Sequence, residues 1–132
     1  MIKVLVVDDY SEHVDTLVST LNMYGCDARG ANDYRAGLQE VVDFKPDLII
    51  CDGLLEGMRA WEFAFTILQQ YYKDNAITGT ANRPYLVSLT GFASTLQRRL
   101  CEECGYDEYV TKPIELSTLL AWVQLARQRA NV

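Results

Sequence analysis

The segment IKVLVVDD at residues 2–9 gives the first indication of the fold. It is an apolar run of Val, Ile and Leu that only Lys3 interrupts and that two aspartates end. A continuous apolar run of this length is typical of a β-strand with both faces buried, as in a parallel sheet. The segment DLIICD at residues 47–52 repeats the pattern and also ends in an aspartate, which predicts a second buried strand.

A helix is predicted after the first strand, because apolar residues recur at the i, i+3, i+4 and i+7 spacing of one helix face. These residues are Val14, Leu17, Val18 and Leu21. We expect Ser11 to cap this helix and Gly25 to end it. A weaker strand at residues 26–31 and a helix at about residues 33–44 lead to the strand at residues 47–51, which gives the order βαβαβ.

The same alternation continues in the second half of the chain. Helical spacing recurs at Trp61, Ala64, Phe65 and Leu68. We expect Trp61 and Phe65 to lie in the core rather than to bind a ligand. The polar segment Lys73–Pro84 lacks periodicity and predicts a loop. Residues 85–89 predict a fourth strand, and residues 93–104 predict a helix.

Residues 108–111 predict a short fifth strand, and the chain ends in a helix. The apolar stripe of this helix consists of Leu116, Leu119, Leu120 and Val123. Strands that alternate with helices predict a parallel sheet covered on both faces, because parallel neighbours need crossover connections. The first, third and fourth strands are the most apolar and should be central, which gives the 2-1-3-4-5 order of flavodoxin-like α/β folds. We expect residues 1–132 to form one domain, since no repeat or linker interrupts them.

Composition narrows the classes of function. The 132 residues are 49% hydrophobic, with a net charge of −6 and a pI of about 4.7. Because Lys and Arg are not clustered, this acidic balance argues against direct nucleic-acid binding, which requires neutralised phosphates. The longest apolar run is far shorter than the ~20 residues that span a bilayer, and no secretion signal is apparent. We therefore expect a soluble, cytoplasmic protein without membrane contact.

Four cysteines raise the question of a metal or redox site. They are Cys26, Cys51, Cys101 and Cys104. A four-ligand zinc site would need distant segments to join the single C-x-x-C pair, so we do not expect zinc. A redox dithiol at Cys101 and Cys104 is an alternative. We favour core thiols, because Leu96, Leu100 and Cys104 share one face of the predicted helix.

Charged and hydroxyl side chains end four of the five predicted strands. Asp8 and Asp9 end the first strand, and Asp52 ends the third. Thr90 and Lys112 end the fourth and fifth. Ligands of open parallel sheets bind beyond the carboxyl ends of the strands, so these side chains should converge.

Such a cluster of carboxylates needs compensating charge. At a separation of about 4 Å, two carboxylates repel by about 4 kcal/mol at an effective dielectric constant of 20. Lys112 can balance one charge, and Mg²⁺, which prefers oxygen ligands, can balance the rest. Because a metal that bridges phosphoryl oxygens assists in-line transfer, the cluster favours phosphoryl transfer to a carboxylate, with Thr90 and Lys112 facing the phosphoryl group.

At these residues the chain resembles the receiver domains of two-component response regulators, from Lys3 to about Arg127. Four stretches carry the resemblance: VLVVDD at 4–9, DLIICD at 47–52, LVSLTG at 86–91 and GYDEYVTKP at 105–113, of which the last is the most specific. The resemblance implies a signalling domain that accepts a phosphoryl group rather than an enzyme.

The resemblance also implies roles for individual residues. Asp52 would be the phosphoacceptor, and Asp9 and Asp52 would ligate Mg²⁺. Asp8 would assist through water, and the backbone carbonyl of Leu54 would complete the protein ligands.

Three further positions match the switch of the family. Thr90 looks like the switch hydroxyl and Lys112 like the family's lysine. Tyr109 looks like the aromatic residue whose ring position reports activation. The Lys112–Pro113 bond resembles the family's cis peptide.

The chain departs from the family pattern in two places. After the acceptor, Glu56 stands where proline is usual, and residues 59–60 read Arg-Ala instead of Asp-Gly. The Lys73–Pro84 segment is longer than the usual connection. We assign no site role to His13, expected to be a solvated helix residue, or to Arg127 and Arg129, whose charges favour the dipole of the last helix.

The leading hypothesis is a phosphorylation switch. A histidine kinase, a phosphotransfer protein or a small phosphodonor would phosphorylate Asp52, and the fourth helix, fifth strand and fifth helix would then present a changed surface to a downstream protein. The domain could stand alone or be part of a hybrid kinase or longer regulator. One alternative is a pseudo-receiver that only binds partners. Another is an Asp-nucleophile phosphatase, but that family needs D-x-D, whereas Asp8 and Asp9 are adjacent.

Overall fold

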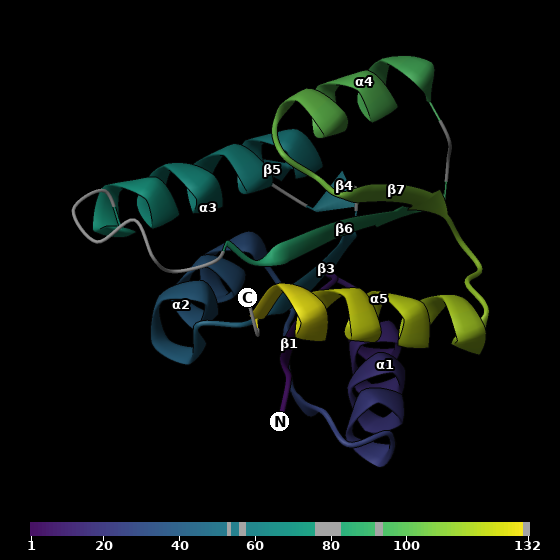
Figure 1. Cartoon of the computed structure of the whole chain (residues 1–132). Helices are drawn as coiled ribbons and strands as arrows, with labels where there is room; N and C mark the ends of the chain where they lie inside the picture. Colours follow the sequence, from purple (N-terminus) through teal and green to yellow (C-terminus); the bar gives the residue numbers. More distant parts are fainter. Residues whose placement is uncertain (53, 56–57, 76–82, 92–93, 131–132) are drawn as a thin grey trace.

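A five-stranded, wholly parallel sheet forms the centre of the computed structural model (Figure 1). In spatial order its strands are β2 (Asp27–Ala31), β1 (Lys3–Val7), β3 (Leu48–Asp52), β6 (Tyr85–Thr90) and β7 (Glu108–Thr111). The structure describes residues 1–52, 54–55, 58–75, 83–91 and 94–130. The predicted 2-1-3-4-5 order of a flavodoxin-like fold is confirmed, since β6 and β7 are the fourth and fifth strands of this sheet.

Within the described residues, five helices cover the two faces of the sheet. They are α1 (Ser11–Met23), α2 (Tyr34–Phe44), α3 (Ala60–Asn75), α4 (Thr95–Glu103) and α5 (Leu116–Ala130). Residues of α1 and α5 share one core cluster with the sheet, and residues of α2, α3 and α4 share the other. In Figure 1, α5 lies next to α1 and apart from α3 and α4.

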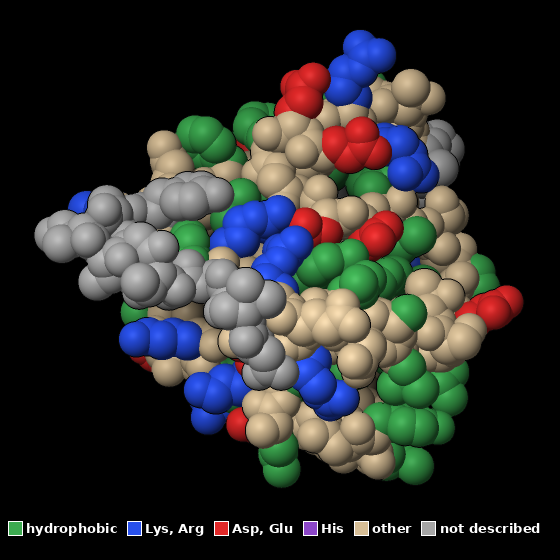
Figure 2. All heavy atoms as spheres, viewed as in Figure 1, with side chains coloured by type: hydrophobic (Ala, Val, Ile, Leu, Met, Phe, Trp, Pro, Cys, Tyr) green, Lys and Arg blue, Asp and Glu red, His purple; other side chains and the backbone are tan. Residues whose placement is uncertain are grey.

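The surface carries both signs of charge. On the face shown in Figure 2, Lys and Arg side chains lie among Asp and Glu side chains and hydrophobic ones. Among the described helices, none combines the length and the apolar character that crossing a membrane would require.

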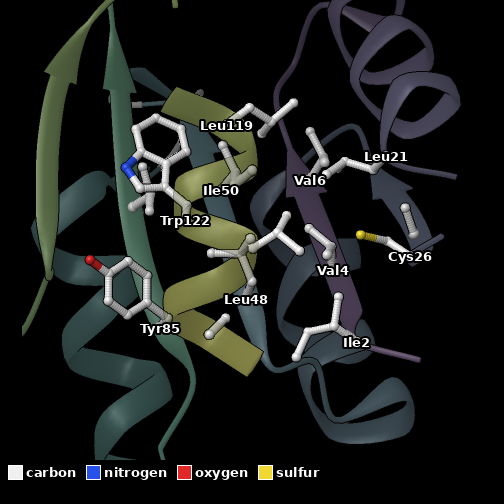
Figure 3. Packing of buried hydrophobic residues seen from close by; sticks show 14 of the residues in the cluster. Ile2, Val4, Val6, Leu21, Cys26, Leu48, Ile50, Tyr85, Leu119 and Trp122 are labelled. Carbon is white, nitrogen blue, oxygen red and sulfur yellow. The ribbon is translucent and has the colours of Figure 1, made fainter. Parts of the chain in front are cut away.

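Alternation along the central strands divides the core into two layers. Val4 and Val6 of β1 face α1 and α5, whereas Leu5 and Val7 face the other three helices. Figure 3 shows the first layer, in which the β1 and β3 side chains point toward Leu119 and Trp122 of α5. Because each fully buried side chain of this size contributes about 1.5–3 kcal/mol, both faces hold the sheet in place.

The observed ends of the helices agree only in part with those predicted from the sequence. Asp33 caps α2, since its carboxylate accepts a hydrogen bond from the Ala36 amide at 2.8 Å. Gly25 follows α1 with a φ of +85°, a conformation that suits glycine. The prediction that Ser11 caps α1 is wrong, because the helix already includes Ser11 and its N-cap is Tyr10.

Two corrections concern α3. The helix continues to Asn75, so residues 73–75 of the predicted loop are helical, and residues 76–82 lie outside the described residues. The expectation that Phe65 lies in the core is wrong, because the residue is 50% exposed and Phe63 is buried instead. Trp61 is partly buried and packs against the core cluster that α2, α3 and α4 share with the sheet.

The buried faces of α4 and α5 are also rotated from the predicted ones. In α4, Leu96 is 63% exposed and Cys101 is fully buried. In α5, Leu116 is 44% exposed and Leu120 is only partly buried. The buried residues of α5 are Leu119, Trp122, Val123 and Ala126. Successive residues of a helix are about 100° apart around its axis. A buried stripe that is displaced by one residue therefore turns a different face of the helix toward the core.

A second, two-stranded sheet was not predicted from the sequence. Strands β4 (Leu54–Leu55) and β5 (Met58–Arg59) pair antiparallel directly after β3. This pairing lies where the chain departs from the family pattern. Glu56, the residue that replaces the usual proline, lies outside the described residues.

Candidate functional site

Three carboxylates meet at the carboxyl ends of β1 and β3. These strands are neighbours, and their register pairs Val7 with Cys51. The residues that follow, Asp8, Asp9 and Asp52, each place a carboxylate oxygen within 4.8 Å of the others. Asp8 is buried, Asp52 is partly buried and Asp9 is exposed. The cluster therefore opens to solvent on the Asp9 side.

Lys112 reaches this cluster from the far side of β6. Its backbone amide donates to the Thr90 carbonyl at 2.7 Å, which continues the pairing of β7 with β6. Its Nζ lies 3.2 Å from Oδ2 of Asp8 and 3.6 Å from Oδ2 of Asp52. One ammonium offsets only one of the three carboxylate charges, so the site retains a net negative charge.

Asp8 is held in its ionised form. Burial raises the pKa of its carboxyl, but the Tyr10 amide, the charge of Lys112 and a hydrogen bond from Lys112 lower it by more, so the net pKa is below the ordinary value. The Tyr10 amide donates to Oδ1 at 2.9 Å. At neutral pH the cluster therefore contains a fixed, buried negative charge.

The donor set fits a hard divalent cation. Carboxylate oxygens of different burial, together with water on the exposed side, are the ligands that Mg²⁺ prefers. Leu54, whose backbone carbonyl was expected to contribute, begins β4 two residues after Asp52. The chemistry of these residues is thus compatible with the expected metal.

Thr90 and Tyr109 lie on the two strands beside the cluster. Thr90 is buried at the end of β6, with 4% of its surface exposed. Tyr109 is buried on β7, and the guanidinium of Arg98 from α4 lies 5.0 Å from its ring centroid. The Lys112–Pro113 peptide is cis, as the resemblance implied.

His13 is the neighbour that sequence reasoning missed. Its Nδ1 lies 3.3 Å from Oδ2 of Asp8, although half of its side chain, 52%, is exposed. The available signal was its position in the first turn of the helix that follows Asp8. The expectation of a solvated helix residue is confirmed by this exposure, but the contact with Asp8 was not predicted.

Arg129 also has a partner that the sequence did not reveal. With Arg83 it binds the carboxylate of Asp107, at 2.9 Å and 2.8 Å respectively. Its charge is thus part of an ion-pair network and does more than favour the helix dipole.

The cysteines behave as core residues rather than as a redox pair. All four are free, and three are buried. Burial raises the pKa of Cys101 to about 11, and burial also raises the pKa of Cys104. A thiol with a raised pKa forms little of the reactive thiolate, which argues against the dithiol alternative.

Comparison with known proteins identifies the family of the chain. The model of the response regulator receiver domain family matches residues 4–124. The DNA-binding dual master transcriptional regulator RpaA of Synechocystis is 30% identical over 131 residues, which are 99% of this chain and 51% of that protein. The chain therefore spans about half the length of this curated relative.

Solved structures share the fold over nearly the whole chain. The chemotaxis protein CheY4 of Vibrio cholerae is 27% identical, with a TM-score of 0.80 and coverage of 96% of this chain and 98% of that one. A two-component response regulator from Clostridium difficile has a TM-score of 0.82 at 21% identity, with both chains fully covered. At that identity the second likeness concerns the fold alone.

The fold and the cluster at the carboxyl ends of the strands define a class of protein. It consists of flavodoxin-like α/β domains in which several carboxylates and a lysine meet beyond the central strands. Within that class, the chain belongs to the response regulator receiver domain family of two-component systems. Receiver domains are signalling domains rather than classical enzymes.

Proposed function

We propose that the chain is a phosphorylation switch in which Asp52 accepts a phosphoryl group in the presence of Mg²⁺. The observation that carries the proposal is the meeting of Asp8, Asp9 and Asp52 with the ammonium of Lys112 at one edge of the sheet. Membership of the receiver family supports it. Structural helix caps or turn residues would not need three carboxylates and a lysine at one point.

Asp52 is better suited to attack than Asp8. Its side chain is 14% exposed, against 6% for that of Asp8, so a donor can approach it more readily. In the transfer, a bond forms between an Asp52 oxygen and phosphorus. The P–N bond of the donor phosphohistidine breaks, and its electron pair stays on the imidazole nitrogen. With a small acyl phosphate, the P–O bond breaks and the carboxylate leaves.

The other residues of the cluster would hold the group in place. Asp9, Asp52 and the Leu54 carbonyl would bind Mg²⁺ directly, and Asp8 would bind through water. When bound, the ion would offset charge on the phosphoryl oxygens. Lys112, whose Nζ lies 3.6 Å from Asp52, would donate to the same oxygens.

Thr90 and Tyr109 would transmit the change. The Thr90 hydroxyl would donate to the phosphoryl group from the end of β6, and the Tyr109 ring on β7 would respond. Because Tyr109 contacts Arg98 of α4, a movement of its ring would alter the surface formed by α4, β7 and α5. A downstream protein would bind that surface.

We infer a protein partner in the cytoplasm rather than a nucleic acid or a membrane. The net charge of −6 and the mixture of acidic and basic side chains in Figure 2 support this inference. DNA binding is stated in the name of RpaA, a protein of which this chain spans about half the length.

The decisive experiment is phosphorylation by a small donor. We expect the full chain, incubated with Mg²⁺ and acetyl phosphate, to acquire a labile adduct of about 80 Da, the mass that a phosphoryl group adds. Mass spectrometry would detect the adduct, and Asp52→Asn should prevent it. If the wild type remains unmodified, the domain is better described as a pseudo-receiver that only binds partners. Multiple turnover of an aryl phosphate would instead indicate a phosphatase.

A further inference from the structure

Asp8 receives hydrogen-bond donors from three parts of the chain. The Tyr10 amide binds Oδ1 at 2.9 Å. Oδ2 lies 3.2 Å from Nζ of Lys112 and 3.3 Å from Nδ1 of His13. Since an ionised carboxylate only accepts, Nδ1 of His13 must carry the proton in this contact. His13 therefore acts on the buried carboxylate as a donor.

The His13 ring is itself held by its neighbours. The Tyr10 ring meets it edge-on, with the centroids 4.5 Å apart and the planes at 71°. The hydroxyl of Tyr10 lies 3.1 Å from Oε2 of Glu12. The His13 amide also donates to the Tyr10 carbonyl at 3.1 Å. Although half exposed, the imidazole is therefore oriented toward Asp8 before any ligand arrives.

Lys112 contacts two carboxylates, those of Asp8 and Asp52, whereas the described contacts of the His13 imidazole include only one carboxylate, that of Asp8. Nζ of Lys112 also lies 3.6 Å from Asp52. If the proposed phosphoryl group on Asp52 draws this ammonium away, His13 still donates to Oδ2 of Asp8. The orientation of Asp8 would then depend on the imidazole.

We propose that His13 is a positioning residue that fixes the Asp8 carboxylate for cation binding during phosphorylation. This inference rests on the proposed function, because it concerns the metal of the same site. Hydrogen-bond partners that orient a metal's ligands commonly change metal affinity by 10- to 100-fold. Because Tyr10 and Lys112 also hold Asp8, we expect an effect of about tenfold.

The test compares three replacements of His13 in the full chain. His13→Asn places an N–H donor where Nδ1 now lies, His13→Phe keeps a ring but has no donor, and His13→Gln moves the donor one bond farther out. Mg²⁺ affinity is measured by calorimetric titration, and phosphorylation by acetyl phosphate is followed against Mg²⁺ concentration. Thermal unfolding without Mg²⁺ reports whether each variant folds.

We expect His13→Phe and His13→Gln to raise the half-saturating Mg²⁺ concentration about tenfold, with His13→Asn close to the wild type. The maximal rate at saturating Mg²⁺ should change little, because the residue acts through the metal. Unchanged Mg²⁺ dependence in all three variants would overturn the inference, as would an equal loss in the Asn and Phe variants. A wild type that binds no Mg²⁺ and forms no adduct would instead contradict the proposed function, and the role of His13 with it.

Discussion

Asp8 and Asp52 both end buried strands, yet their surroundings differ. Asp8 is the more buried, and donors from Tyr10, His13 and Lys112 surround its carboxylate. Asp52 is more open and lies farther from the lysine, at 3.6 Å. At the scale of single residues, Asp8 is thus a carboxylate held by hydrogen bonds and Asp52 is the more approachable of the two, and Lys112 contacts both.

Lys112→Ala should uncouple the switch from its phosphorylation. Asp52 and the metal ligands remain, so the adduct should still form with acetyl phosphate. The conformational change of Thr90 and Tyr109 on phosphorylation should, however, be several-fold smaller. The measurement is the change in the Tyr109 ring signals in NMR spectra on phosphorylation. Lys73→Ala removes an exposed lysine of α3 and serves as the control. Equal changes in phosphorylated wild type and Lys112→Ala would contradict the coupling role.

Leu54→Asn should shorten the life of the phosphorylated state. Water hydrolyses an acyl phosphate in line, and the leucine side chain, two residues after Asp52, has no group to orient that water. A positioned hydrogen bond should raise the rate about 10- to 100-fold, or roughly 1.4 to 2.7 kcal/mol. The decay of phospho-Asp52 after donor removal measures this, with Leu54→Met as the apolar control. Phe92, two residues after Thr90, is likewise apolar and is expected to help shield the site from water. Phe92 and the side chain of Leu54 both lie outside the described residues.

At the scale of elements, Asp107 joins three segments at the opposite end of the sheet from the site. Its carboxylate binds Arg83 before β6, Arg129 near the end of α5 and the amide of Leu86 in β6. Arg129 also lies over the Tyr85 ring, 4.9 Å from its centroid. The end of α5 is therefore tied to the starts of β6 and β7, and apolar packing is not its only attachment.

Asp107→Asn should destabilise the fold in a pH-dependent way. Burial raises the pKa of Asp107, but Arg129, the Leu86 amide and Arg83 lower it by more, so the folded-state pKa lies below the ordinary value. The stabilisation is therefore complete above about pH 3.9, the usual unfolded-state pKa, and is lost as the pH falls through the folded-state pKa. We expect a loss of about 2 kcal/mol at pH 7 in urea unfolding, typical of hydrogen bonds to a charged group.

The difference between wild type and Asp107→Asn should shrink below about pH 3.9, because the wild-type carboxyl then takes up a proton. Asp43→Asn, at an exposed position of α2, should have little effect at either pH. A difference that stays constant from pH 7 to pH 3 would show that the charge of Asp107 is not the source of the stability.

At the scale of the whole molecule, the sheet brings together residues that are far apart in the chain. Lys112 and Asp8 are 104 positions apart, yet they lie within 3.2 Å. The site exists only when β1, β3, β6 and β7 are assembled, so a ligand of the carboxylate cluster binds the folded state alone. Ligand binding and global stability are therefore linked.

Mg²⁺ should raise the melting temperature of the whole domain. At a hundredfold excess over Kd the stabilisation should be about 2.7 kcal/mol, which is several degrees for a domain of this size. Asp9→Ala should lose most of this gain. The measurement is thermal unfolding by circular dichroism with and without millimolar Mg²⁺, with Ca²⁺-free buffer throughout. An identical response from wild type and Asp9→Ala would show that these carboxylates hold no metal.

Much of the fold and of the site was predictable because both depend on local patterns. The apolar runs that form β1 and β3 end at aspartates. Because the strands alternate with helices that serve as crossover connections, only a few sheet topologies are possible. The prediction that Asp8, Asp9, Asp52 and Lys112 converge follows from the parallel arrangement alone. Their distances confirm that geometry, while their roles in phosphorylation remain predictions.

The sequence by itself determined the strand order and which side chains lie at the carboxyl ends of the strands. The apolar pattern of each strand and the position of each polar residue after it are sufficient for both inferences. Only the tertiary structure decided that Phe63 rather than Phe65 is buried, because the rotation of α3 depends on what packs against it. It likewise decided that His13 binds Asp8 and that Arg129 binds Asp107. These contacts depend on the direction in which a side chain points from its helix, and residues on other segments set that direction.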